Sequence, residues 1–235
     1  EICDRVTVMR DGEYVGTEVV KNTTKDALIA MMVGRELTNY YTRDFEEHEE
    51  VIMRCEGISD GELAENVSFE LRKGEILGFA GLVGSGRTEL MNCLFGVDKR
   101  AGGEIRLNGK DISPRSPLDA VKKGMAYITE SRRDNGFFPN FSIAQNIAIS
   151  RSLKDGGYKG AMGLFHEVDE QRTAENQREL LALKCHSVNQ NITELSGGNQ
   201  QKVLISKWLC CCPEVIIFDE PTRGIDVGAK AEIYK

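Results

Sequence analysis

The sequence lacks a long apolar run, an excess of basic residues and cysteines in paired metal-binding spacing. No stretch reaches the length and hydrophobicity of a membrane span, and the first residues lack the basic-then-apolar order of a secretion signal. We therefore expect a protein that neither crosses nor enters a bilayer. Lys and Arg number 30 against 37 Asp and Glu, which gives a net charge of −7 without a basic stripe. This balance argues against a nucleic acid partner.

The cysteines indicate neither disulfide bonds nor a metal site. They are odd in number and lie in apolar or helical stretches: Cys3, Cys55, Cys93, Cys185, Cys210, Cys211 and Cys212. We predict reduced, packed thiols of a cytosolic protein. The run of three is a poor metal site, because adjacent side chains on a helix point in different directions and no histidine lies nearby in the sequence.

Hydrophobic residues make up 40% and charged residues 29% of the chain, as expected of a folded core with a polar surface. Residues 4–18 alternate around Asp11-Gly12, which predicts a hairpin. Thr23 or Thr24 then caps a helix that ends near Gly34. Residues 38–50 are polar and acidic and predict a linker. The chain opens without Met and stops inside the helical pattern 229–234, so we expect an internal piece of a longer polypeptide.

Residues 75–94 are the stretch around which the rest is organised. The apolar run 76–80 predicts a buried strand, followed by a glycine loop and the start of a helix. Such a loop turns its N–H groups around a polyphosphate, and the helix adds its positive dipole end. A glycine turn that serves packing alone is the alternative. The candidate nucleotide-binding residues are Gly81, Gly84, Ser85, Gly86, Arg87 and Thr88, and the Thr88 hydroxyl is a candidate Mg²⁺ ligand.

Arg87 departs from the usual form of this loop, which has Lys before the Ser or Thr. A compact ammonium reaches between the β- and γ-phosphates, whereas a guanidinium is a wide planar fork. The positive charge is kept, but its fit to the phosphates is altered.

Further elements follow from the same patterns. We expect strands over 51–55, 67–71, 104–107 and 125–129 and helices over 117–123, 143–149 and 168–183. A charged loop at 130–136 follows one of these strands. The aromatic cluster at 137–141 is interpreted as packing, with a partner-contact surface as the alternative.

Two later stretches favour phosphate binding by the glycine loop over a role in packing alone. Residues 195–202 read LSGGNQQK, where a capping Ser and two glycines open a helix with accessible N–H groups. Residues 215–218 read as a fully buried strand that ends in Asp219-Glu220. Asp219 would hold Mg²⁺, and Glu220 would polarise a water molecule for in-line attack on a γ-phosphate. The order of these three stretches is far more specific than any one of them.

Together these motifs resemble the ATP-binding cassette family over nearly the whole chain. The resemblance implies an α/β fold of the P-loop NTPase type, with a mixed β core, an antiparallel β subdomain and a helical subdomain at about 131–195. In this family, ATP lies between the phosphate loop of one cassette and the signature helix of the opposing one. The corresponding residues are Leu195, Ser196, Gly197, Gly198 and Asn199 for the signature, Glu130 in place of a Mg²⁺-sensing Gln, and Gly224 and Asp226 at the cassette interface.

The segments MMVGREL, GLVGSGRTEL, ITESRRDNG and FDEPTRGIDVGAK are similar to the second cassette of double-cassette ATPases that import monosaccharides. The resemblance implies that residues 1–39 end a first cassette, 40–50 link the two, and 51–235 form a second cassette that stops before the switch His. It implies ATP and Mg²⁺ as cofactors, and as partners membrane permease subunits, the opposing cassette of the same full-length chain and, indirectly, a periplasmic sugar-binding protein. The expected location is the cytoplasmic face of the inner membrane.

Two other functions stay open. One is a soluble cassette that acts on ribosomes or DNA, which the acidic balance disfavours. The other is a regulatory cassette in which ATP clamps a dimer without being split, which the Asp219-Glu220 pair disfavours. Because Arg87 and Glu130 depart from the usual residues, we expect slow turnover at the site built on Arg87.

Overall fold

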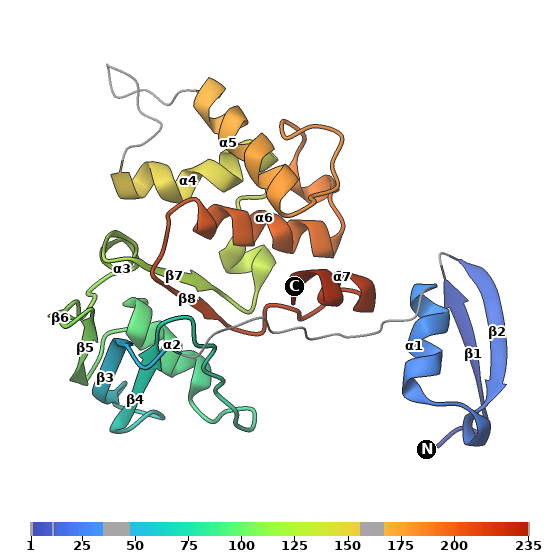
Figure 1. Ribbon diagram of the computed structural model, residues 1–235, viewed down its shortest axis with the longest axis horizontal. Helices are drawn as coiled ribbons and strands as arrows, with labels where there is room; N and C mark the ends of the chain where they lie inside the picture. The colour runs from blue at the N-terminus through green and yellow to red at the C-terminus, as the bar shows by residue number, and fades with distance from the viewer. Residues whose placement is uncertain (1, 11, 35–47, 156–166, 235) are drawn as a thin grey trace. The chain divides into compact units, whose positions relative to one another are not determined.

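The computed structural model describes residues 2–10, 12–34, 48–155 and 167–234, so most of the expected linker lies outside the described residues. The chain divides into two compact units, one made of residues 1–44 and 224–235 and the other of residues 45–223. Figure 1 labels the elements of both units.

The first unit contains the predicted hairpin and helix. β1 (Arg5–Arg10) and β2 (Glu13–Val19) pair antiparallel, and η1 (Val20–Asn22) leads to α1 (Lys25–Val33). The Thr24 hydroxyl accepts a hydrogen bond from the Ala27 N–H at 3.2 Å, and Gly34 ends the helix with φ 80°. Both predictions are confirmed. α7 (Val227–Ile233) has Asp226 as its N-cap, and its carboxylate accepts from the Ala229 N–H at 2.8 Å.

The second unit begins with an antiparallel sheet of order β4-β3-β5-β6. Its strands are β3 (Val51–Ser59), β4 (Val67–Arg72), β5 (Gly102–Leu107) and β6 (Lys110–Asp111). Asn108 and Gly109 join the last two with φ values of 49° and 75°, as a tight hairpin turn requires. On β3, the side chains of Met53, Cys55 and Ile58 are buried beneath α2 (Arg87–Phe95) in the first hydrophobic core.

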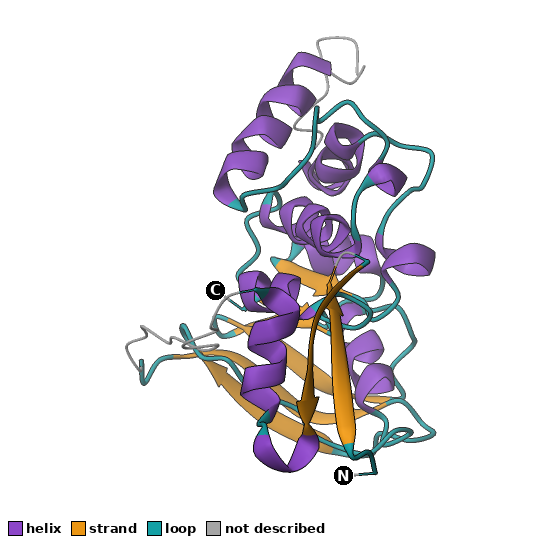
Figure 2. Ribbon diagram, turned by 90° about the vertical axis from the view of Figure 1, so that its right-hand side faces the viewer, coloured by secondary structure: helices purple, strands orange, loops and turns teal. Residues whose placement is uncertain are grey.

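A short parallel sheet joins this part of the unit to its helices. β7 (Met125–Ile128) and β8 (Val215–Phe218) pair in register, with Tyr127 opposite Ile217. Alternate side chains point to opposite faces, so Met125 and Tyr127 join the core under α2. Helix α6 (Gly197–Leu209) also contacts β7, and Figures 1 and 2 place α2 and α6 on different sides of this sheet.

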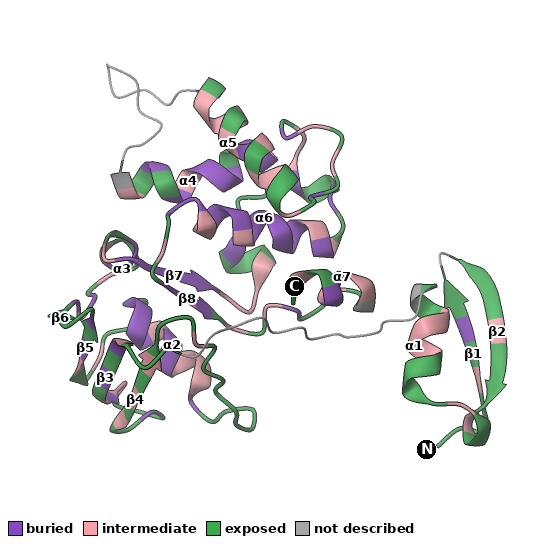
Figure 3. Cartoon of the chain, in the orientation of Figure 1, coloured by how far each residue is buried: buried purple, intermediate pink, exposed green. Residues whose placement is uncertain are grey.

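The helical part has a second core of its own. It contains α4 (Ile143–Asp155), α5 (Glu167–Leu180) and α6, with η3 (Ile192–Glu194) leading into α6. Ile143, Ile147 and Leu204 are almost fully buried there, and Figure 3 shows α6 as largely buried along its length. α3 (Pro117–Lys122) and a single π-turn, η2 (Arg132–Gly136), complete the unit. The predicted helices and the strands 51–55, 67–71, 104–107 and 125–129 are thus confirmed, with shifted ends.

The predicted strand over residues 76–80 is wrong. Residues 75–82 have no regular secondary structure, and Ile76 is 79% exposed. The prediction that residues 215–218 are fully buried is also wrong, because Phe218 is 48% exposed. The two errors share a cause. An apolar run forms a buried strand only beside a partner, and in the described structure β7 and β8 pair only with each other.

The cysteines are all free, as predicted. Four are buried, and burial raises the pKa of the Cys55 and Cys210 thiols to about 12. Packing was expected of every cysteine, and this is wrong for Cys3 and Cys212, which are exposed. Cys212 follows the end of α6 at φ 45°, so its side chain leaves the helix core. No helix in the described ranges is both long and apolar enough to pass through a membrane.

Candidate functional site

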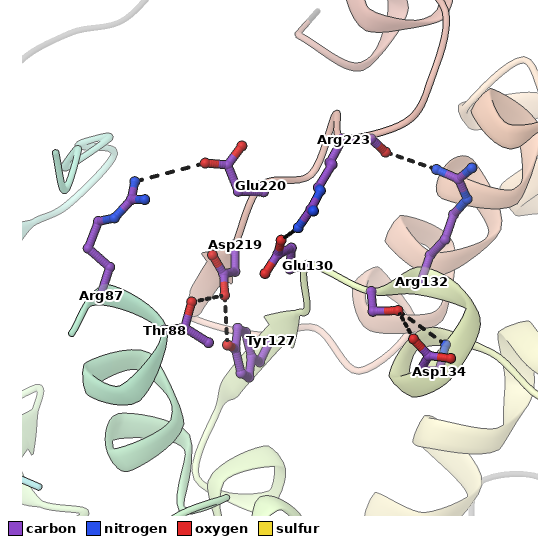
Figure 4. Close-up of polar contacts among 10 residues, drawn as sticks. Arg87, Thr88, Tyr127, Glu130, Arg132, Asp134, Asp219, Glu220 and Arg223 are labelled. Atoms are coloured by element: carbon purple, nitrogen blue, oxygen red, sulfur yellow. Dashed lines mark hydrogen bonds and ion pairs between the residues drawn. The ribbon is translucent and has the colours of Figure 1, made fainter. Parts of the chain in front are cut away.

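The helix start of α2 and the end of β8 meet at Thr88 and Asp219. The Thr88 hydroxyl donates a hydrogen bond to Asp219 Oδ2 at 3.0 Å, across 131 residues of sequence (Figure 4). Asp219 is held by its own N–H, which donates to the Ile128 carbonyl at 2.9 Å. A hydroxyl and a carboxylate oxygen are ligands that suit Mg²⁺, which commonly takes one or two protein oxygens together with phosphates and water. The two residues therefore fit a shared Mg²⁺ ion.

Tyr127 contacts the same carboxylate from β7. Its hydroxyl lies 3.2 Å from Asp219 Oδ2 and 3.2 Å from Asn92 Oδ1. Burial, reinforced by the Asp219 charge, raises the pKa of this phenol well above its ordinary value. Tyr127 belongs to none of the motifs recognised in the sequence. A possible signal was a residue with a polar group inside the otherwise apolar strand MAYI.

Arg87 and Glu220 approach each other above this contact. A guanidinium nitrogen of Arg87 lies 3.9 Å from Glu220 Oε1, and both side chains are partly exposed. Glu220 has φ 46°, which is uncommon for a residue with a side chain and turns the chain sharply after β8. The pair places a cation beside the Glu220 carboxylate (Figure 4).

A second arginine pairs with the other selected carboxylate. Glu130, just after β7, forms an ion pair with Arg223. Arg132 donates to the Arg223 carbonyl at 3.0 Å, so two residues of the charged loop 130–136 contact the segment that follows β8. Burial lowers the pKa of Arg132, and neighbouring Arg133 adds to this. Arg223 was not selected from the sequence, because its partner lies 93 residues away.

The phosphate loop itself is open. Residues Gly81 to Ser85 are exposed, and a single turn is closed by the Ser85 N–H donating to the Leu82 carbonyl at 3.1 Å. Gly84 and Gly86 have φ values of 81° and 80°, a conformation that favours glycine, and Gly86 is the N-cap of α2. This loop leads directly into the helix end that would face a polyphosphate.

The signature segment lies at the start of α6. Ser196 occupies the N-cap position, but its hydroxyl does not cap the helix. It accepts a hydrogen bond from the Asn199 side-chain amide at 2.9 Å, while Asn199 Oδ1 accepts from the Lys184 N–H at 2.9 Å. The prediction that Ser196 caps through its side chain is therefore wrong, because Asn199 supplies a competing donor. Leu195 packs in the second core, and Gly198 is also buried.

The structure thus brings five selected residues to one sheet edge: Arg87, Thr88, Glu130, Asp219 and Glu220. The signature residues start a helix on the other side of that sheet (Figure 1). Gly224 and Asp226 belong to the first compact unit. In the described ranges, no group of three or more His, Cys, Asp or Glu side chains could hold a metal ion without further ligands.

Two known proteins are similar to the chain over its whole length. The chain is 78% identical over 240 residues to the D-allose import ATP-binding protein AlsA of Escherichia coli strain K12, covering all of this chain and 47% of that protein. It is 45% identical over 235 residues to the ribose import ATP-binding protein RbsA of Clostridium tetani, covering all of this chain and 46% of that protein. The chain therefore spans about half the length of these relatives.

A solved structure and a family profile agree with this similarity. The structure of MJ1267, an ATP-binding cassette of an ABC transporter, matches with a TM-score of 0.65 and 26% identity over 78% of this chain and 74% of that one. The predicted α/β cassette fold is confirmed by this likeness. Residues 64–223, which carry every motif described above from the phosphate loop to Glu220, match the ABC transporter family profile. The chain belongs to the ABC transporter family.

Proposed function

We propose that the protein binds and hydrolyses ATP to energise the import of a monosaccharide through a membrane permease. The observation that carries this proposal is the meeting of Thr88 and Asp219 at the helix start and strand end, in a chain 78% identical to a D-allose import ATP-binding protein. D-allose or a related sugar is the proposed cargo. The cargo rests on similarity alone, because no residue of the site is suited to bind a sugar.

The proposed roles follow the geometry. The phosphate loop, with Gly81, Gly84, Ser85, Gly86 and Arg87, binds the ATP phosphates through its N–H groups and the guanidinium. Thr88 and Asp219 hold Mg²⁺, which when bound neutralises charge on the phosphates. Glu220 orients the attacking water, and Glu130 contacts the metal side of the site.

The proposal includes a two-cassette polypeptide. Residues 1–39 would end a first cassette, 40–50 a linker, and the rest a second cassette whose Leu195 to Asn199 segment closes over the first cassette's ATP. Gly224 and Asp226 would contact that cassette. The assembly would lie at the cytoplasmic face of the inner membrane with its permease subunits, served indirectly by a periplasmic sugar-binding protein. The span of about half the length of the relatives supports this arrangement.

The two ATP sites are proposed to be unequal. The site built on this chain's own loop has Arg87 in place of Lys, and Arg87 lies near Glu220, where its charge opposes the role of that carboxylate as a base. Most hydrolysis would then occur at the site closed by Ser196 and its neighbours. Because each proposed ATP site takes residues from two cassettes, positioning and transition-state charge stabilisation would both be incomplete at a site formed by one cassette. We expect this chain by itself to have negligible ATPase activity.

Sugar uptake by the full-length, permease-assembled protein in proteoliposomes tests this proposal. Ser196→Arg should abolish ATP-driven uptake, because a bulky cation at the helix start blocks closure over the opposing ATP. Thr193→Arg is the matched control: it adds the same side chain at an exposed position three residues earlier and should leave uptake unchanged. Arg87→Lys should change uptake less than twofold. Collapse of uptake with Arg87→Lys together with indifference to Ser196→Arg would contradict the unequal-site proposal.

A regulatory clamp that binds ATP without splitting it is the second candidate. The exposed phosphate loop and the Arg87–Glu220 pair favour it, since both suit binding more than turnover. Release of inorganic phosphate by the assembled transporter separates the two functions: sugar-dependent release supports import, and binding of ATP without release supports the clamp.

A further inference from the structure

Tyr127 holds a buried hydroxyl against the proposed metal ligand Asp219. The residue is 3% exposed, and its ring packs edge-to-face on Phe95 with centroids 5.5 Å apart. Phenylalanine would fill the same space and make the same ring contact. Since burying a hydroxyl costs free energy unless it is hydrogen-bonded, packing does not explain the tyrosine. The polar contacts of its hydroxyl with Asn92 and Asp219 account for it.

The backbone of the parallel sheet sets this contact. Tyr127 is in register with Ile217, and Asp219 lies two residues beyond Ile217, so it projects from the same face. The Asp219 N–H donates to the Ile128 carbonyl at 2.9 Å, which extends the ladder to the carboxylate. The phenol is therefore fixed by strand β7, and Asp219 is the residue that directly follows strand β8 (Figure 4).

The phenol has one proton and two acceptors within reach, Asn92 Oδ1 and Asp219 Oδ2, both at 3.2 Å. A charged carboxylate is the stronger acceptor, so the proton belongs with Asp219. Asp219 Oδ2 then receives two donors, Thr88 and Tyr127. Thr88 is itself a proposed metal ligand, whereas Tyr127 is not, so Tyr127 can restrain the carboxylate whatever Thr88 binds.

We propose that Tyr127 is a positioning residue that fixes the Asp219 carboxylate for a divalent cation bound together with nucleotide. This inference rests on the proposed function, because it assigns a supporting residue to the same metal site. Hydrogen bonds to metal-binding carboxylates typically support metal affinity by about 10- to 100-fold. Tyr127 should contribute at the lower end of that range, because Thr88 donates to the same oxygen.

The test measures Mn²⁺ binding to the full-length protein in the presence of ATP by electron paramagnetic resonance. Tyr127→Phe should weaken Mn²⁺ binding about 10-fold, while ATP binding in EDTA stays within twofold of the parent. Asn92→Ala is the matched control: it removes the other acceptor of the phenol and leaves the bond to Asp219. It should lower thermal stability but keep the parent affinity for Mn²⁺.

Each outcome decides the inference. Equal Mn²⁺ affinity in Tyr127→Phe and the parent overturns it, as does an equal loss in Asn92→Ala, which would reveal a general packing effect. If Tyr127→Phe does not fold, Tyr127→3-fluorotyrosine replaces it: this side chain keeps the donor, so weakened Mn²⁺ binding overturns the inference and parent-like or tighter binding supports it. A parent protein that binds ATP but no Mn²⁺ overturns the proposed metal site and the role of Tyr127 with it.

Discussion

The two glycine-bearing segments proposed to face phosphate are built differently. In the phosphate loop, Gly84 and Gly86 have positive φ values, and the loop from Gly81 to Ser85 is exposed. In the signature segment, Gly197 and Gly198 are ordinary first residues of α6, which is buried along much of its length. Glycine is thus required for backbone conformation in the first segment. In the second, it leaves the helix N–H groups free of side chains.

The phosphate loop and the signature segment also differ in their surroundings. The residues before the phosphate loop, 76–80, are exposed and unpaired, whereas the signature segment continues into the second hydrophobic core. A preformed helix start loses little conformational entropy when it meets a ligand, but an open loop must be ordered by one. We therefore expect the phosphate loop to gain order from nucleotide and the signature helix to gain none.

The largest expected effect is a difference in stability cost between a substitution in α6 and one in residues 76–80, the segment before the phosphate loop. Leu204 is 2% exposed in the second core, so Leu204→Ala should lower the free energy of unfolding by about 2–5 kcal/mol. Ile76 is 79% exposed, and Ile76→Ala should change it by less than about 0.5 kcal/mol. Urea unfolding followed by circular dichroism measures both values, with an unchanged denaturant slope as the control. Equal losses would indicate that residues 76–80 pack as the strand that their sequence predicts.

This contrast also marks what could be predicted from the sequence. Thr24, Gly34 and the Asn108-Gly109 turn were predictable because caps and tight turns depend on a few adjacent residues. The strand over 76–80 was not, because a strand depends on a distant partner that an apolar pattern does not identify. Local signals therefore predicted most helices and hairpins, while the order of the strands followed only from the three-dimensional structure.

The candidate site divides in the same way. Thr88 and Asp219 were predictable because each ends a recognisable motif. Tyr127 and Arg223 were not, because their contacts depend on the register of β7 with β8 and on the path of the chain after β8. The exposure of Arg87 and Glu220 is likewise a property of the fold, and it decides how strongly their opposite charges interact.

The next largest expected effect is on the pH dependence of stability, and it concerns Lys207, which links α6 to the charged loop 130–136 by a hydrogen bond. It is 7% exposed, donates to the Gly136 carbonyl and lies 4.8 Å from the Trp208 ring centre. Burial lowers its pKa from 10.5 to about 8. Between these values the unfolded chain holds a proton that the folded chain has released. The contribution of Lys207 to stability should therefore rise with pH across this window, by at most about 1.4 kcal/mol per pH unit.

The Lys207→Met variant isolates the pH-dependent contribution of Lys207 to the free energy of unfolding. The free energy of unfolding of the parent minus that of the variant should increase between pH 8 and pH 10, as measured by urea titrations at matched ionic strength. The buried thiols of Cys55 and Cys210 have raised pKa values and act in the opposite direction, but both proteins contain them, so they cancel in the difference. A difference that is flat with pH would mean that Lys207 titrates normally and is accessible to water.

The smallest expected effect tests the glycines themselves. A methyl group at Gly84 would meet no atom within 4 Å, so Gly84→Ala isolates the cost of its φ of 81°. This cost should lower the free energy of unfolding by about 1 kcal/mol. Gly197→Ala places alanine in a helix and should leave stability unchanged or raise it by up to about 0.5 kcal/mol. Thermal unfolding resolves these opposite signs. If both variants are destabilised equally, the signature glycines are also needed for backbone conformation. The two segments then do not differ in their need for glycine.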